Sequence, residues 1–316
     1  MMSQRLLLVS PVYNEASYLE LVARAVAAQT RRPDRWVIVD DGSTDRTPEI
    51  LRELAAALDF VEVVTVARSP VKDGAKDKLA VAADARSFML GVEHGDWRAF
   101  THVAKLDGDT ELPPGYFERI LDEFERDPEL GLAGGVYADP DPSGRGDGWK
   151  VMRVPTDHHV PGTLKCYSAA CFASIDGIQE RLGWDTIDET YARMRGYRTR
   201  SFPDLVTRHH RPAATADGTL RGRARHGQCA YIAHFTPTWV GLRAFKVARL
   251  PPRGLSGAAF LYGYASAAAH RVQRVQDDEF RAFVHRELRG RMLGALRPRA
   301  ASSAGRIMVG RKRAEA

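Results

Sequence analysis

Strand-length and helix-length patterns alternate along the first part of the chain. Nearly continuous apolar runs, typical of parallel strands buried on both faces, stand at 5–12, 36–39 and 61–66. Between and after them, apolar residues at helical spacing predict helices over about 19–29, 50–58 and 79–91. This order predicts an α/β fold with a mostly parallel, Rossmann-like sheet, right-handed crossovers and flanking helices.

The pattern continues with less regular spacing. Further strands are predicted at 103–106 and 132–137, with a helix that restarts over 112–117. Beyond residue 213 the apolar positions predict a C-terminal helical extension, with amphipathic segments around 239–249 and 280–292. We therefore expect a main domain over 1–212, a basic helical extension over 213–298, and a disordered tail over 299–316.

Composition places the chain among soluble globular proteins. It has 316 residues, of which 44% are hydrophobic and 27% charged, so it can bury a large core. The net charge of +6 is concentrated in the second half and favours anionic partners. The three cysteines lack zinc-ligand spacing, and we identify no export or membrane-spanning segment. We therefore expect a cytoplasmic protein.

Polar and acidic residues follow three of the predicted strands. Tyr13 follows the first, the pair Asp40-Asp41 the second, and Asp107-Gly108-Asp109 the fourth. The carboxyl ends of parallel strands share one edge of a sheet, where open α/β sheets bind ligands. Converging carboxylates require a cation between them, and a divalent metal that carries a diphosphate prefers such oxygen ligands.

Three segments carry a family resemblance. SPVYNEASYLELVARAVAAQT, RWVIVDDGSTDRTPEIL and AKLDGDTELPPGYFERIL occur in the order and at the spacing of the inverting family 2 glycosyltransferases. The resemblance covers roughly residues 5–212. It implies the GT-A fold, a nucleotide-diphospho-sugar donor, and a divalent cofactor, Mn²⁺ or Mg²⁺.

The same resemblance assigns residues to the donor. Pro11 and Tyr13 would line the base, and Glu15 would hold the ribose and the loop. Asp41 would accept from a uracil-type N3–H, a role that suits a carboxylate because it accepts without donating, while Asp40 braces the turn.

Two further donor contacts are expected. Lys78 would lie near the diphosphate, although the surrounding run 71–78 also fits a solvated charged loop. Gly134 and Gly135 would allow the backbone to approach the donor sugar closely.

The metal site is expected at the third motif. Asp109 would be the direct ligand, and Asp107 would reach the ribose or a metal-bound water. A histidine in 208–211 resembles the extra ligand of some GT-A enzymes, and we favour His210 over His209.

The stretch 177–202 resembles the segment of the family that lies on the acceptor side of the cleft. Inverting transfer needs a carboxylate that deprotonates the acceptor hydroxyl. Asp185, Asp188 and Glu189 are available, and we favour Asp188 with Asp185 as the alternative. Trp184 would stack on an acceptor sugar or pack as a buried indole.

These features predict transfer of a single sugar to a glycan or lipid-linked acceptor. The chain has neither membrane spans nor the Gln-x-x-Arg-Trp signature of processive synthases. The mixed apolar and basic C-terminal helices suit an anionic membrane surface, such as the inner face of the cell membrane, or a plain helical cap. A nucleotidyltransferase and a non-catalytic membrane-surface or nucleic-acid binding module are the alternatives, and we expect no nucleic acid partner.

Overall fold

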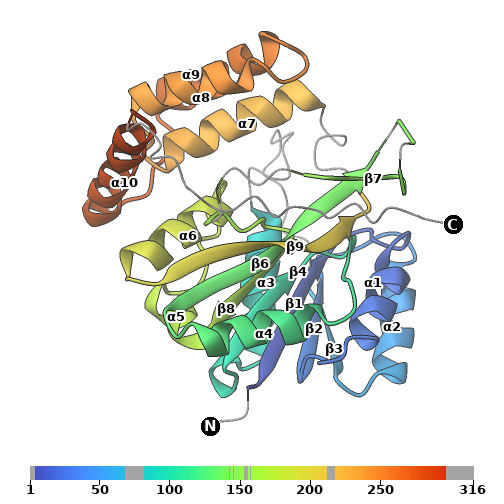
Figure 1. Cartoon of the computed structure of the whole chain (residues 1–316). Helices are drawn as coiled ribbons and strands as arrows, with labels where there is room; N and C mark the ends of the chain where they lie inside the picture. Colours follow the sequence, from blue (N-terminus) through green and yellow to red (C-terminus); the bar gives the residue numbers. More distant parts are fainter. Residues whose placement is uncertain are drawn as a thin grey trace, which may run out of the picture.

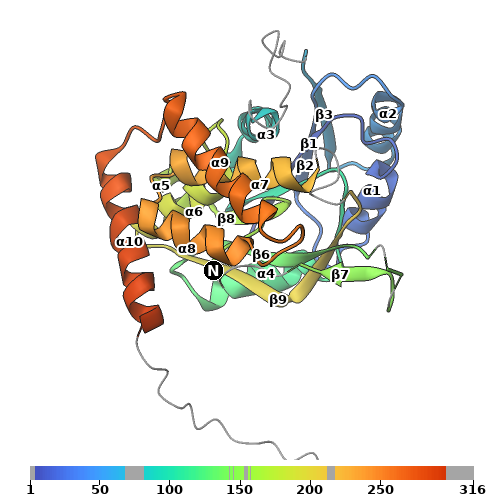
Figure 2. The ribbon, with the colours of Figure 1, turned by 90° about the horizontal axis from the view of Figure 1, so that it is seen from above.

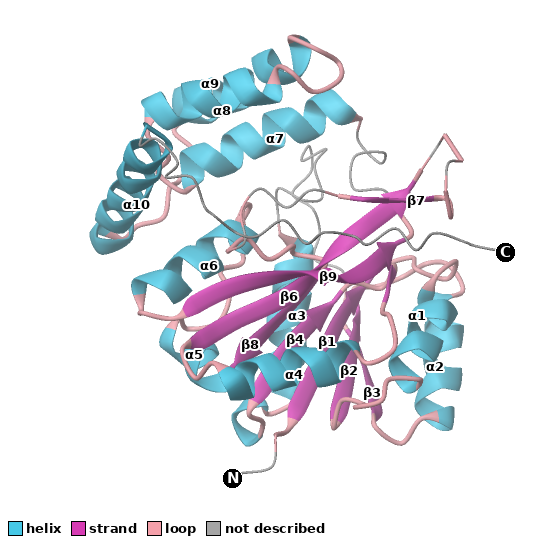
Figure 3. Cartoon of the chain, in the orientation of Figure 1, coloured by secondary structure: helices cyan, strands magenta, loops and turns pink. Residues whose placement is uncertain are grey.

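The computed structural model describes residues 4–67, 82–141, 143–144, 146–152, 156, 158–211 and 218–296. Within these residues the chain folds around one nine-stranded sheet with helices on both faces (Figures 1 and 3). The predicted α/β class with a Rossmann-like sheet is confirmed. The expected tail over 299–316 lies outside the described residues.

The parallel half of the sheet comes from the predicted strands. It has the order β3 (Val61–Thr65), β2 (Arg35–Asp40), β1 (Leu6–Val12), β4 (His102–Leu106). All three pairings in this half are parallel, so the carboxyl ends of β1, β2 and β4 meet at one edge.

The other half of the sheet is mixed. It continues through β8 (Leu164–Ser168), β6 (Leu130–Pro140), β9 (Arg198–His209) and β5 (Thr110–Glu111), while β7 (Trp149–Val151) pairs with β6. Strand β8 is antiparallel to both β4 and β6, whereas β6 and β9 are parallel. Strand β5 returns antiparallel to the end of β9, directly beside the Asp107-Gly108-Asp109 turn.

Alternating side chains of the strands feed two separate cores. In β1, Leu6 and Leu8 point to one core, while Leu7 and Val9 point to the other. The first core is covered by α1 (Leu19–Ala27), α2 (Thr47–Ala57) and α4 (Tyr116–Arg126). The second is covered by α3 (Ala83–His94), the 3₁₀ turn η1 (Trp97–Ala99), α5 (Ala169–Ser174) and α6 (Trp184–Met194). The result is a three-layer α/β/α arrangement.

The C-terminal extension is helical, as expected. It consists of α7 (Thr219–Ile232), α8 (Pro237–Val247), α9 (Leu255–Ala269) and α10 (Asp278–Leu296). Helices α7, α8 and α9 lie beyond the carboxyl edge of the sheet, as the side and top views agree (Figures 1 and 2). Ile187 of α6 shares a core with Phe280 and Val284 of α10, so the extension packs on the main domain.

The expected boundary at 212 and 213 falls between described segments, so the division into domains stays a prediction. Among the described helices, none combines the length and apolarity needed to cross a bilayer.

Candidate functional site

Strand pairing brings the end of β9 to the Asp107-Gly108-Asp109 turn. Thr110 is paired with His209 and Glu111 with Arg208. The His210 N–H donates to the Asp109 carbonyl at 2.9 Å. Residues 209–211 therefore lie against the turn, although about a hundred positions separate the two segments in the chain.

An acidic cluster occupies this edge of the sheet. The Arg211 Nη2 donates to Glu15 Oε2 at 2.6 Å, and Arg211 Nε lies 3.9 Å from Asp109 Oδ2. Burial raises the pKa of Glu15 to about 8; repulsion from Asp109 adds to this effect and Arg211 opposes it. Arg211 thus lies between two carboxyl groups, those of Glu15 and Asp109.

Asp107 is held by a lysine from its own strand. Lys105 stands two positions earlier in β4, so its side chain lies on the same face and forms an ion pair with Asp107. Burial raises the pKa of Asp107 to about 6, which Lys105 opposes and Asp109 reinforces. Lys105 Nζ also donates to the Gly162 carbonyl at 3.2 Å. Asp107 is thereby fixed in orientation.

The two histidines point in different directions. His209 Nε2 lies 3.5 Å from Asp109 Oδ1, and its Nδ1 lies 3.0 Å from Asp139 Oδ1. His210 Nε2 instead contacts Glu111 Oε2 at 3.0 Å. His209 is the last residue of β9 and His210 follows the strand, and it is His209 rather than the favoured His210 that faces the Asp109 carboxylate.

Burial alone would lower the pKa of His209, but the hydrogen bond to Asp139 and the charge of Asp109 outweigh it and raise that pKa.

The side chains at this edge have the chemistry of a divalent cation site. Asp109 offers a carboxylate and His209 an imidazole, and the crowded carboxylates favour a positive charge. In the part of the chain that the structure describes, no three His, Cys, Asp or Glu side chains are already arranged around one point. A cation that takes one or two protein ligands and completes its shell with water and diphosphate oxygens fits such a set.

The residues predicted to receive the nucleoside lie at the ends of β1 and β2. Pro11 is paired with Val39 in the sheet, and Tyr13 follows at the end of β1; both are half-buried. Asp40 accepts from the Ser43 N–H at 2.9 Å and so braces the turn, as expected. Asp41 follows it and remains partly exposed at the sheet edge. Lys78 and the loop 71–78 lie outside the described residues.

Gly134 and Gly135 lie in a crowded part of β6. A Cβ at Gly135 would lie 2.2 Å from the Leu205 carbonyl oxygen, and the Gly135 N–H donates to the Tyr116 hydroxyl at 2.6 Å. A Cβ at Gly134 would meet Val160 and the Leu164 backbone. The glycines permit close approach of neighbouring protein segments, and their expected position beside the donor sugar stays a prediction.

Asp188, the favoured base, is fully engaged inside the protein. Its carboxylate accepts from Lys165 Nζ at 2.9 Å to each oxygen, from the Tyr167 hydroxyl at 2.5 Å, and from the Glu189 N–H at 2.6 Å. The side chains of Asp188 and Lys165 are both completely buried. A base must reach the acceptor hydroxyl, and this environment argues against Asp188 because no oxygen is available to it. Glu189 is likewise buried, between Lys165 and His159.

Asp185 remains partly exposed, in the first turn of α6. A Cβ placed on Gly162 would lie 3.4 Å from the Asp185 Cβ, and the Gly162 carbonyl binds Lys105, the partner of Asp107. Gly162 therefore lies beside Asp185 and also binds the lysine that holds Asp107. Trp184, next to it, is a buried indole whose Nε1 donates to Asp84 at 3.2 Å.

Several residues that contact this site were not predicted from the sequence. Lys105, Lys165, Asp139 and Arg211 hold the carboxylates and the imidazole in place. For Lys105 a signal existed, because its spacing of two from Asp107 in a strand puts both on one face. For Arg211 the same alternation groups it with His209. The contacts of Asp139 and Lys165 depend on strand pairing between distant segments, which the sequence does not reveal.

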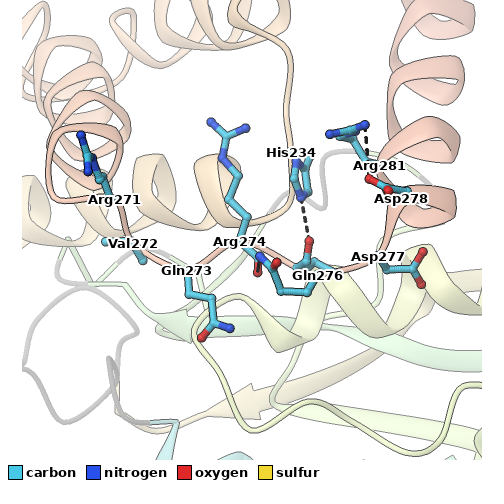
Figure 4. Close-up of a pocket in the computed structure, with 10 residues that line it drawn as sticks. His234, Arg271, Val272, Gln273, Arg274, Gln276, Asp277, Asp278 and Arg281 are labelled. Carbon is cyan, nitrogen blue, oxygen red and sulfur yellow. Dashed lines mark hydrogen bonds and ion pairs between the residues drawn. The ribbon is translucent and has the colours of Figure 1, made fainter.

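A separate hollow of about 610 Å³ lies within the helical extension. His234, from the connection between α7 and α8, lines one part of it. The other lining residues are 271–278 and Arg281, from the connection between α9 and α10 and the start of α10 (Figure 4). None of the predicted site residues lines it.

Comparison with known proteins agrees with this geometry. The family described as Glycosyl transferase family 2 matches residues 8–174. A polyprenol monophosphomannose synthase of Mycolicibacterium smegmatis is 26% identical over 152 residues, 48% of this chain and 51% of that protein. An undecaprenyl-phosphate 4-deoxy-4-formamido-L-arabinose transferase of Pseudomonas fluorescens is 33% identical over 124 residues, 38% of this chain. That match spans only 32% of the Pseudomonas protein.

Among solved structures, a mannosyltransferase of Pyrobaculum calidifontis in complex with GDP-Man and Mn²⁺ has a TM-score of 0.54 at 19% identity. The alignment covers 93% of this chain and 81% of that one, and it confirms the predicted GT-A fold. The family match takes in more than half of the residues, and the chain therefore belongs to glycosyltransferase family 2.

Proposed function

We propose that this protein transfers one sugar, with inversion and with the help of a divalent metal, from a nucleotide-diphosphate-sugar to a lipid-linked or glycan acceptor. The observation that carries the proposal is the position of Gly162: its carbonyl accepts from Lys105, the partner of Asp107, and it lies beside Asp185. Gly162 thus adjoins both the lysine that binds the acidic turn and a partly exposed carboxylate that is expected on the acceptor side. Family membership favours sugar transfer over the nucleotidyltransferase alternative.

On the donor side, Pro11, Tyr13 and Asp41 would receive the base, and Glu15 would border the ribose. Asp109 and His209 would hold Mn²⁺ or Mg²⁺, which would supply Lewis-acid stabilisation of the departing diphosphate. Asp107, fixed by Lys105, would orient the ribose or a water of the metal. His210 stays a weaker prediction as a ligand, because its ring faces Glu111.

On the acceptor side, Asp185 would act as the base. The acceptor oxygen would bond to the anomeric carbon as the bond from that carbon to the diphosphate oxygen breaks on the opposite face. The proton of an acceptor hydroxyl would pass to an Asp185 oxygen. Lys165, which binds both the Asp185 carbonyl and the Asp188 carboxylate, would keep the start of α6 in place.

The names of the two curated relatives support a lipid-linked acceptor, since one refers to polyprenol and the other to undecaprenyl phosphate. An acceptor of this kind is embedded in a bilayer. We therefore also propose that the protein acts at a membrane surface, on the cytoplasmic side, and not as a nucleic-acid binding module.

A thermal-shift screen of nucleoside diphosphates and nucleotide-sugars, each with and without Mn²⁺, tests the donor site. One nucleotide class should stabilise the protein in a metal-dependent way, by about 2.7 kcal/mol at a hundredfold excess over Kd. Asp109→Ala should abolish the effect. Asp122→Ala removes a partly exposed carboxylate of α4 that pairs with Arg126, and should leave the effect unchanged. No stabilisation by any nucleotide class would overturn the proposal.

A further inference from the structure

An apolar face is exposed on helices α8 and α9. Leu242 and Phe245 of α8, and Leu255 and Tyr262 of α9, have exposed fractions between 57% and 69%. In α8 the opposite side is buried through Val240 and Ala244, so Leu242 and Phe245 form the outer face of an amphipathic helix. Leu250 in the connecting turn and Leu261 in α9 extend this exposed set.

Cations are interleaved with these side chains. Lys246, Arg249 and Arg253 are exposed between Phe245 and Leu255. The Arg249 guanidinium lies 4.4 Å from the centre of the Phe245 ring. No aspartate or glutamate occurs anywhere in the sequence from 218 to 276, which includes all of α7, α8 and α9. The face is therefore both apolar and positively charged, without compensating acidic side chains of its own segment.

We propose that this face, defined by Leu242, Phe245, Lys246, Arg249, Leu250, Arg253 and Leu255, is a docking surface for an anionic lipid bilayer. Apolar side chains enter the boundary between headgroups and acyl chains, while lysine and arginine bind the anionic headgroups. In this arrangement α8 and α9 would lie in the plane of the surface, as amphipathic helices do. The proposal rests on the proposed function, because it supplies the membrane that a lipid-linked acceptor requires.

A second copy of the chain fits this face less well. In a two-fold dimer the same patch meets itself, so three cations would face three cations across the interface. An anionic surface instead neutralises them.

The position of the face agrees with this assignment. In Figure 1, α7 lies between the sheet and the pair α8–α9, which form the outer layer of the extension. Helix α7 packs tightly on α9, since a Cβ at Gly263 would lie 1.8 Å from the Ala224 carbonyl oxygen. The docking surface is thus coupled rigidly to α7, which lies beyond the carboxyl edge of the strands that holds the candidate site.

The experiment is co-sedimentation of the full chain with vesicles of phosphatidylcholine alone or with added phosphatidylglycerol. Binding should require the anionic lipid and should fall as salt is raised. The double substitution Lys246→Gln/Arg249→Gln should weaken binding roughly fivefold for each cation removed. Leu242→Ser/Phe245→Ser should also weaken it, by roughly tenfold or more. The matched controls are Leu90→Ser in α3 and Arg24→Gln in α1, both exposed elsewhere, and they should bind like the wild type.

Each variant is also measured for metal-dependent stabilisation by nucleotide, which reports correct folding and the donor site. Loss of vesicle binding with intact nucleotide response supports the docking surface. Equal binding of wild type and patch variants, or a patch-dependent dimer that does not sediment with vesicles, overturns it and leaves the proposed function standing. Vesicle binding without any nucleotide response would overturn the proposed function instead.

Discussion

Replacing Asp188 by asparagine keeps the shape of the side chain but removes its charge from a completely buried pair. Lys165 would retain the Asp185 carbonyl at 2.6 Å and the Glu189 carboxylate at 3.4 Å, and the amide oxygen of the new side chain can still accept from it. Removing one partner of a buried ion pair costs about 3–5 kcal/mol where the other charge is left without compensation, and Glu189 offsets part of that cost here. Asparagine can still accept from Tyr167 or the Glu189 N–H, so we expect the lower end, about 3 kcal/mol.

A loss of about 3 kcal/mol corresponds to a fall in Tm of roughly 4–5 °C for a chain of 316 residues, because the entropy of unfolding grows with chain length. Asp185→Asn, three residues earlier on the same helix, is the matched variant. Its side chain is partly exposed, so we expect a change in Tm within about 1 °C, together with a loss of transfer of about 10²- to 10⁴-fold.

The two variants are compared by differential scanning calorimetry and by single-turnover sugar transfer, normalised to the fraction of folded protein. The reasoning is refuted if Asp188→Asn unfolds at the wild-type temperature and has lost transfer while Asp185→Asn transfers normally. That outcome would return the role of base to Asp188. Normal transfer by both variants would instead indicate an acceptor oxygen that needs no base, such as that of a phosphate.

Two further predictions concern the acidic edge of the sheet. His209→Ala should remove most of the Mn²⁺-dependent part of nucleotide stabilisation, whereas His210→Ala should retain it; equal losses in isothermal titration would count against the assignment. Because the folded pKa of Glu15, about 8, exceeds its ordinary value of 4.5, the folded state binds the extra proton between these pH values. Stability contributed by that proton is therefore lost as pH rises from about 5 to 8, with a slope of at most about 1.4 kcal/mol per pH unit. Denaturant unfolding in EDTA should show that Glu15→Gln flattens this dependence; an unchanged slope would contradict the cause.

The parallel half of the sheet could be predicted because each of its strands is a local signal. The run 5–12 is apolar throughout since β1 is covered on both faces, and β1 spans Leu6–Val12. The mixed half gave weaker signals. Strand β9 carries exposed residues such as Arg198 and Arg200, and its pairing with β6 shifts register between Gly135 and Val136. Register and bulges of this kind depend on partners that are distant in sequence.

The residues of the site also differ in whether a local sequence signal or a distant partner determines their position. Asp107 and Asp109 come directly after β4, so their position at the carboxyl edge of the sheet could be predicted from the sequence. The choice between Asp185 and Asp188 could not, because it depends on burial and on Lys165 and Tyr167, which come from β8. Two carboxylates three residues apart on a helix look alike in a sequence until the opposing element is known.

Arg211 gives the acidic edge a cation that belongs to the protein itself. Its guanidinium contacts Glu15 and reaches toward Asp109, whose carboxylate the proposed divalent ion would need. A free metal ion must compete with this arginine for that carboxylate. A metal that arrives together with a diphosphate brings new anionic oxygens, to which the displaced guanidinium can transfer. If the proposed donor site is right, the consequence would be an ordered exchange of counter-ions, in which the cleft would discriminate against metal alone and accept it with its nucleotide.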